Sequence, residues 1–237
     1  MYFRISSATA LDDASASART GSRRGCRFLS VFHFESRKNP EALVRAFGRV
    51  AGEVHDAELV LKLDGVTDEA FATWLRATLR PEDLHALAGR LRVITSRLSS
   101  EAMRALYRDS DVFVLASRGE GYGLPYLEAL AQGRATICPD VGGHREFCTP
   151  ENSLVVPTTA QPATLCASSG VFRESWWREV DADALSATML AAAAHPERLA
   201  ALGERGRTDA QRFSVASVQD RARRRLDEIT ASLARGS

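Results

Sequence analysis

Residues 111–133 read DVFVLASRGEGYGLPYLEALAQG, and this stretch decides the fold. Its opening run, DVFVLA, is mostly apolar and partly β-branched, which is typical of a buried strand. The loop GEGYG follows, and its glycines allow a tight turn and a close approach of a ligand to the backbone. Leu124 and Pro125 then begin a helix, which Gly133 ends. The stretch therefore predicts a strand, a glycine-rich loop and a helix in succession.

The same alternation continues in both directions along the chain. Apolar runs predict five further strands, at 27–32, 57–63, 92–95, 134–138 and 153–156. Helical patterns separate them or follow them, at 40–54, 68–79, 81–88, 99–108 and from 183 onward. We therefore expect an α/β fold with a doubly wound, six-stranded parallel sheet and right-handed crossovers.

The length of the chain bounds its domain organisation. Its 237 residues are enough for one α/β core and too few for two complete domains. Within residues 1–26, the stretch 8–25 is rich in Ala, Ser, Arg and Gly and has no apolar periodicity. We expect residues 1–26 to be a linker or a frayed arm, and 27–237 to form one domain.

Composition excludes several classes of function. The net charge of +1 gives no overall field that would attract nucleic acid. No apolar run approaches the roughly 18 residues that span a bilayer, and no signal peptide is visible. The four cysteines form no C-x-x-C pair, so we expect free thiols and no zinc site. We therefore expect a cytoplasmic protein with no nucleic-acid partner and no transmembrane segment.

Two carboxylates flank the predicted helix start, with seven residues between them. We expect Glu120 to face the cleft from the loop, and Glu128 to occupy an inward position one turn into the helix. Carboxylate oxygens accept hydrogen bonds from sugar hydroxyls. The free amides at Gly123 and Leu124 favour a phosphate, because a helix start carries partial positive charge. The loop therefore suits a ligand with both phosphate and hydroxyl groups.

At this point the sequence resembles glycosyltransferase family 4. The E-x7-E arrangement within GYGLPYLEALAQG is similar to the signature of that family. Four further stretches, from residue 27 towards the end of the chain, are similar to other family segments in the same order: FLSVFHFESRKNP, LSSEAMRALYRDSDVFVLAS, VGGHREF and ENSLVVP. Five matching motifs in order are far more specific than one.

The resemblance implies a Rossmann-like domain that forms the C-terminal, donor-binding half of a GT-B fold. The implied activity is transfer of a sugar from a nucleotide-diphosphate donor to an acceptor hydroxyl, with retention of the anomeric configuration. It implies no metal and no cofactor, since the nucleotide-sugar is the substrate. The acceptor-binding half is missing from this chain, so we expect little activity without an acceptor-binding domain or subunit.

The resemblance also implies residue roles. Glu120 and Lys38 match the catalytic positions, where the lysine neutralises the diphosphate, and Glu128 matches the carboxylate that binds the ribose. The other residues that match donor-binding positions are Arg37, His33, Gly121, Tyr122, Gly123, Leu124, Gly142, Gly143, Arg97 and Leu98. One departure concerns His33: the family usually has Gly-Arg or another base where this chain has Phe32-His33, so a fixed positive charge is missing.

Some features have simpler interpretations. Asp109-Ser110-Asp111 imitates a D-x-D metal motif, but it lies on the amino side of the predicted sheet, away from the site. Trp176 and Trp177 are interpreted as a packing anchor for an irregular stretch, 158–180.

Two alternative functions remain. The chain could be one subunit of a split glycosyltransferase, or a non-catalytic nucleotide-sugar-binding module or remnant of a truncated gene. Apolar residues at Val215, Val218, Leu226 and Ile229 on the last helix predict an exposed surface for self-association or for a partner domain.

Overall fold

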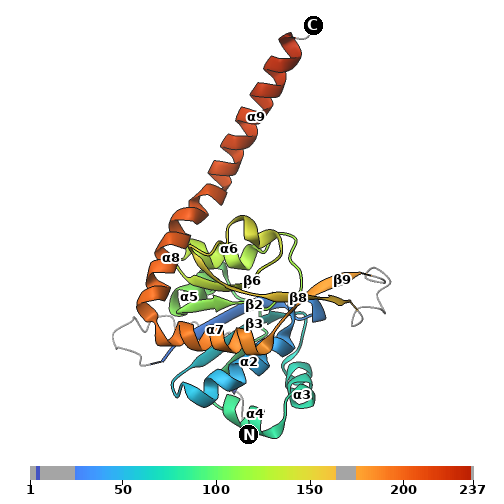
Figure 1. Ribbon diagram of the computed structural model, residues 1–237, viewed down its shortest axis with the longest axis vertical. Helices are drawn as coiled ribbons and strands as arrows, with labels where there is room; N and C mark the ends of the chain where they lie inside the picture. Colours follow the sequence, from blue (N-terminus) through green and yellow to red (C-terminus); the bar gives the residue numbers. More distant parts are fainter. Residues whose placement is uncertain (1–3, 6–24, 164–174, 236–237) are drawn as a thin grey trace.

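The computed structural model describes residues 4–5, 25–163 and 175–235 (Figure 1). Its centre is a parallel sheet with the strand order β1-β4-β3-β2-β5-β6-β7. The strands are β1 Arg4–Ile5, β2 Arg27–His33, β3 Glu58–Asp64, β4 Leu91–Ile94, β5 Val112–Val114, β6 Ala135–Pro139 and β7 Ser153–Val156. The six expected strands are all present, and every pairing among them is parallel.

The order of the strands reverses between β2 and β5. The chain runs outward from β2 through β3 to β4, and then returns to β5 on the other side of β2. Such a reversal is a topological switch point, where the loops that leave the two strands diverge and open a crevice at their carboxyl ends. The doubly wound fold is therefore confirmed.

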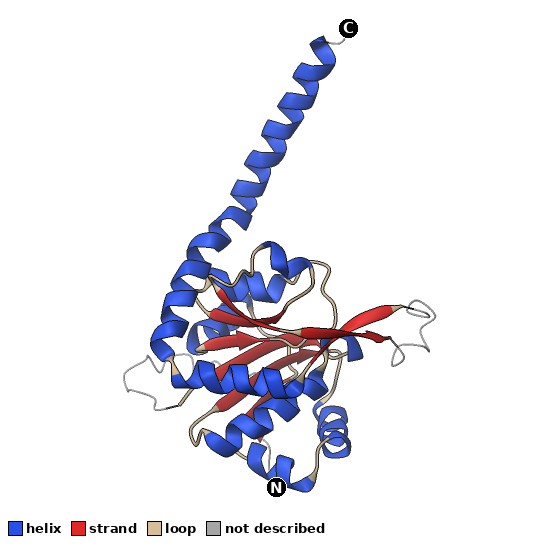
Figure 2. Cartoon of the chain, viewed as in Figure 1, coloured by secondary structure: helices blue, strands red, loops and turns tan. Residues whose placement is uncertain are grey.

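Helices cover both faces of the sheet (Figure 2). They are α2 Pro40–Glu53, α3 Asp68–Thr78, α4 Pro81–Leu87, α5 Ser100–Asp109, α6 Leu124–Ala131, α7 Ala182–Ala194, α8 Pro196–Ala210 and α9 Val215–Arg235, with the short 3-10 helices η1 Ser36–Lys38, η2 Gly143–Glu146 and η4 Gln211–Phe213. Because crossovers are right-handed, outward winding puts α2 on one face, and return winding puts α5 and α6 on the other. α7 packs beside α2, and α8 packs against α6.

The buried core lies between the sheet and these layers. Phe28 and Leu29 of β2, Phe113 of β5 and Ile137 of β6 are fully buried. β2 and β5, which flank the switch point, are therefore anchored by apolar side chains on the central strands. Their carboxyl ends are held in a fixed relation to each other.

A capping residue sets the start of α2. Asn39 adopts a left-handed backbone conformation (φ 53°), and its side chain accepts a hydrogen bond from the amide of Ala42 at 3.3 Å. Pro40 occupies the first helical position, where no N–H is needed. The cap follows from the residue type of Asn39 and from the proline after it, and it fixes where the chain leaves η1.

Two features differ from the expectation. Residues 4–5 pair with β4 as an edge strand, although they lie in the segment predicted as a linker. The stretch that was expected to be irregular carries two antiparallel strands, β8 Thr158–Pro162 and β9 Trp176–Val180. The prediction failed here because β8 is mostly polar and the apolar residues of β9 are interrupted by Arg178 and Glu179, so neither strand shows the continuous apolar run that marks the central sheet. The rest of segment 1–26 apart from 25–26, and Cys166, lie outside the described residues.

The last helix leaves the body of the molecule. α9 is 21 residues long and projects away from the sheet (Figure 1), with nearly all of its residues exposed. Across the described ranges, no helix combines the length and apolar character needed to cross a bilayer.

Candidate functional site

Two loops meet at the switch point. One leaves β2 and carries η1, and the other leaves β5 and leads to α6. The amide of Arg118 in the second loop donates to the carbonyl oxygen of Arg37 in the first at 2.8 Å. Residues that are about 80 positions apart in the sequence are therefore joined directly at the carboxyl edge of the sheet.

A buried ion pair lies between these loops. Nζ of Lys38 donates to Oε1 of Glu120 at 2.5 Å, and the two side chains are only 10% and 7% exposed. A buried charge needs a partner, because burial removes its hydration. In the absence of a ligand each group neutralises the other. An arriving anion would compete with Glu120 for Lys38.

Arg37 adds a second cation to this edge. Its guanidinium donates to the carbonyl oxygen of Gly119 at 2.6 Å and to Glu35 at 2.5 Å, and lies 3.7 Å from Oε2 of Glu120. Part of its charge is therefore already balanced by Glu35. The structure brings Lys38, Arg37 and Glu120 together, as the sequence predicted.

The start of α6 faces the same edge. Gly123 has φ 87°, and a Cβ there would lie 2.8 Å from Cβ of His144 and 3.0 Å from the ring of Tyr126. Glycine is therefore required for both conformation and space. Pro125 offers no N–H, and the amide of Tyr126 donates to the carbonyl oxygen of Gly123 at 3.0 Å. The amides at Gly123 and Leu124 are left as the donors that can meet an anion.

The loop after β6 packs backbone to backbone against this region. The amide of Gly143 donates to the carbonyl oxygen of Glu120 at 2.8 Å. A Cβ on Gly143 would lie 1.9 Å from the carbonyl oxygen of Gly121, and Gly142 has φ 131°. The predicted glycines therefore hold the loops together, a structural role beside the expected role in donor binding.

His144 is a buried residue that the sequence analysis did not assign to the site. Its ring stacks on Tyr126 with centroids 4.5 Å apart, and its Nε2 donates to the carbonyl oxygen of Pro139 at 3.0 Å. Within the described part of the chain, Nδ1 has no hydrogen-bond partner. Burial lowers the pKa of His144 below its usual value. The imidazole is therefore held neutral beneath the loops.

Glu128 lies on the exposed side of α6, so the expected inward position was wrong. Its Oε2 accepts a hydrogen bond from the hydroxyl of Tyr107 at 2.7 Å. Burial, followed by the charge of Glu128, raises the pKa of Tyr107 far above its usual range. Tyr107 therefore remains a donor and fixes the orientation of a carboxylate that is accessible to a ligand.

The remaining predicted residues lie at the same edge of the sheet but make fewer contacts with the two loops. His33 is exposed at the end of β2, and its ring occupies the space above Gly65. Tyr122 is 43% exposed and meets Phe147 edge to face. Arg97 and Leu98 follow β4, two strands from the switch point; the arginine is exposed and the leucine packs against the core.

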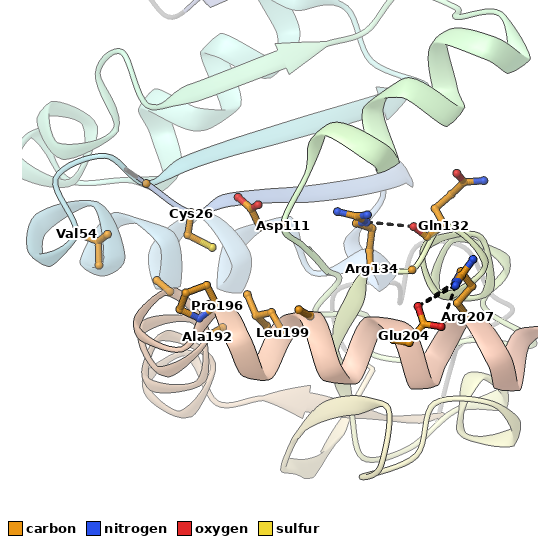
Figure 3. Close-up of a pocket in the computed structure, with 14 residues that line it drawn as sticks. Cys26, Val54, Asp111, Gln132, Arg134, Ala192, Pro196, Leu199, Glu204 and Arg207 are labelled. Carbon is orange, nitrogen blue, oxygen red and sulfur yellow. Dashed lines mark hydrogen bonds and ion pairs between the residues drawn. The ribbon is translucent and has the colours of Figure 1, made fainter. Parts of the chain in front are cut away.

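The opposite edge of the sheet contains a cavity of about 640 Å³ (Figure 3). Its charged groups are paired within the protein: Asp111 accepts from the amide of Arg27 at 2.7 Å, and Arg207 pairs with Glu204 at 2.8 Å. The D-x-D segment lies here, at the amino end of β5, as expected. Among the residues that the structure describes, no group of three or more acidic, His or Cys side chains could hold a metal ion.

Two residues that contact the loops were missed. Arg118 and Glu179 form an ion pair at 2.5 Å between the loop after β5 and β9. Trp177 is buried beneath Arg118, whereas Trp176 is 67% exposed. Of the two tryptophans that were expected to pack, only Trp177 does so. Nothing in the spacing of these residues signals the contact.

Sequence comparison identifies relatives of known activity. The chain is 29% identical over 158 residues to the serotype-specific mannosyltransferase WbdA of Escherichia coli, covering 67% of this chain and 19% of that protein. It is 30% identical over 215 residues to D-inositol 3-phosphate glycosyltransferase of Segniliparus rotundus, covering 88% of this chain and 41% of that protein. The chain therefore spans less than half the length of either relative.

Structural comparison finds the same fold. Sucrose-phosphate synthase of Thermosynechococcus elongatus matches with a TM-score of 0.65 at 23% identity, over 97% of this chain and 50% of that one. The C-terminal domain of the group 1 glycosyl transferase LpcC of Francisella tularensis matches with a TM-score of 0.57 at 18% identity, over 80% of this chain and 87% of that domain. HepE of Anabaena, solved with UDP, matches with a TM-score of 0.64 at 14% identity, over 94% of this chain and 54% of that one.

The family described as "Glycosyl transferases group 1" matches residues 25–168, which is more than half of the chain. This range includes both loops of the switch point and the ion pair between Lys38 and Glu120. It ends before β9. The chain belongs to the group 1 glycosyl transferases.

Proposed function

We propose that this chain is the donor-binding half of a retaining glycosyltransferase that transfers a sugar from a nucleoside-diphosphate donor. The observation that carries the proposal is the buried pair of Lys38 and Glu120 at the switch point, beside the start of α6. A cation and unpaired helix amides there suit a diphosphate, and carboxylates suit the hydroxyls of a sugar and a ribose.

Each residue has a distinct part in this proposal. Lys38 exchanges Glu120 for the diphosphate and stabilises the charge that grows as the bond between sugar and phosphate breaks. Glu120, released from the lysine, accepts from a hydroxyl of the donor sugar. Glu128 accepts from the ribose, in the orientation that Tyr107 sets. Fixed cations and amides supply the stabilisation, so no metal ion is required.

The relatives support a nucleotide-sugar as donor. One relative is a mannosyltransferase, and one structure with the same fold was solved with UDP. Since the chain spans 19% and 41% of the two relatives, the acceptor site belongs to a further domain or subunit in this proposal. A single half cannot align the acceptor oxygen with the anomeric carbon and exclude water.

Isothermal titration calorimetry with a panel of UDP-sugars and GDP-sugars tests the proposal. We expect one-to-one binding of at least one nucleotide-sugar. The chain should also prefer the same nucleotide, UDP or GDP, when it binds the diphosphate without a sugar. A transfer assay with the bound donor then tests whether a further domain or subunit is needed for sugar transfer. Turnover by this chain alone would contradict the half-site proposal, and the anomeric configuration of a product formed with an acceptor domain tests retention.

A further inference from the structure

Glu179 of β9 bridges two residues of the switch-point loops. Its carboxylate accepts from Nε of Arg118 at 2.5 Å and from a terminal nitrogen of the same guanidinium at 3.0 Å. The same carboxylate accepts from the side-chain amide of Asn39 at 2.8 Å. Glu179 is thus bonded to a residue 61 positions earlier and to another 140 positions earlier in the chain.

The two bonded residues are direct neighbours of the proposed catalytic pair. Asn39 follows Lys38, and Arg118 precedes Glu120 by two positions. Arg118 also donates from its guanidinium to the carbonyl oxygen of Ser36 in η1. One carboxylate therefore connects both loops at the point where each presents its charged residue.

This connection is buried at Arg118 and partly exposed at Glu179. The side chain of Arg118 is 7% exposed and that of Glu179 is 22% exposed. The guanidinium of Arg118 lies 4.7 Å from the ring of Trp177, which is two residues before Glu179 on the same strand. The amide of Arg178 donates to the carbonyl oxygen of Arg118 at 3.1 Å, which adds a backbone bond between β9 and the loop. A bidentate arginine pair of this kind restricts orientation as well as distance.

We propose that Glu179 is a positioning residue for the donor site, which sets the separation of Lys38 and Glu120 by fixing the loops that carry them. The proposal rests on the proposed function, because it requires a nucleoside diphosphate that binds at this pair. β9 lies beyond residues 25–168, the range that the family description matches. Part of the site's geometry is therefore maintained by a strand outside the shared region.

The test uses calorimetric titration of the full chain with the nucleoside diphosphate that binds the wild type. Glu179→Ala removes both contacts and should weaken binding about tenfold, as expected for residues coupled through one network. Glu179→Gln keeps one acceptor oxygen and should recover part of this loss. The matched control is Glu58→Ala, which removes an ion pair of 2.7 Å with Arg27 at the amino edge of the sheet. It should alter thermal stability without altering affinity.

A mutant cycle distinguishes positioning from a general loss of structure. In a Lys38→Ala background, Glu179→Ala should cause less than about a twofold further loss, because the pair whose separation it sets is already broken. Equal affinity of the wild type and Glu179→Ala would overturn the inference, as would an undiminished effect in the Lys38→Ala background. Failure of the wild type itself to bind would instead overturn the proposed function.

Discussion

Tyr107 sets the orientation of the Glu128 carboxylate. Its hydroxyl holds one carboxylate oxygen at 2.7 Å, and in the proposed function the exposed side of the carboxylate binds a ribose. Glu128→Gln should weaken nucleotide binding by about 1–3 kcal/mol, since a charge-assisted hydrogen bond is lost. Tyr107→Phe should cost less, about 0.5–1.5 kcal/mol, because Glu128 keeps its charge and loses only its orientation. Calorimetry on both variants would refute this ranking if Tyr107→Phe were the more damaging change.

His144 makes the stability of the fold sensitive to acid. Because burial lowers its pKa, the unfolded chain binds a proton near pH 6.5, where the folded chain does not. The contribution of His144 to the free energy of unfolding is therefore fully present above this pH. It decreases as the pH falls towards the lowered pKa, by at most about 1.4 kcal/mol per pH unit. Glu120 opposes the lowering, and Arg145 adds to it.

Denaturant unfolding at pH 7.5 and pH 5.5 measures this effect. The wild type should lose more unfolding free energy between the two values than His144→Phe, which keeps an aromatic ring on Tyr126 and cannot titrate. The described histidines other than His144 are exposed, so their contributions largely cancel in the comparison. Identical losses in the two proteins would show that His144 is not the responsible group.

At the scale of elements, the loops after β5 and β6 form one packed unit. Gly143→Ala would bring a Cβ within 1.9 Å of the carbonyl oxygen of Gly121, so the loops must separate. We expect loss of both thermal stability and nucleotide binding. Gly121→Ala meets nothing within 4 Å, so it should leave stability unchanged and weaken binding only if the ligand approaches this backbone. Thermal unfolding and calorimetry on the two variants separate these effects, and a stable Gly143→Ala protein with normal affinity would contradict the packing argument.

The sequence predicted those elements whose signals are local. The central strands are continuous apolar runs, and the cap at Asn39 follows from its residue type and the proline after it. Lys38 and Glu120 were assigned to one site through family motifs, and the structure brings them within 2.5 Å. Their roles in binding remain predictions. The exposed orientation of Glu128 depends on how α6 packs, which one short helix does not specify.

The bridge through Glu179 could not have been predicted. It joins polar residues separated by 61 and 140 positions, and no periodicity marks such pairs. β8 and β9 were missed for a different reason: each is five residues long and mixes polar with apolar residues, so neither shows a clear alternation. Long-range polar contacts of this kind appear only when the fold is known.

At the scale of the whole molecule, α9 presents an apolar stripe to solvent. The exposed fractions of its large apolar side chains lie between 43% and 73%, at Val215, Val218, Leu226, Ile229 and Leu233. We expect this chain on its own to self-associate through this stripe. Leu226→Glu combined with Ile229→Glu should yield a monomer, while Ala231→Glu, on the other side of the helix, should not.

Light scattering at high concentration checks the association, and thermal unfolding should be nearly unchanged because these side chains are exposed. A wild type that is monomeric at every concentration would contradict the expectation.

The central claim is that the switch point, rather than the cavity at the amino edge, binds the nucleoside diphosphate. A crystal structure of the chain with the diphosphate that binds it, grown in EDTA, tests this most directly. We predict phosphate oxygens within hydrogen-bond distance of Nζ of Lys38 and of the amides at Gly123 and Leu124, with Glu120 released from the lysine. A diphosphate in the cavity of Figure 3, or one seen only when a divalent metal is added, would contradict the account.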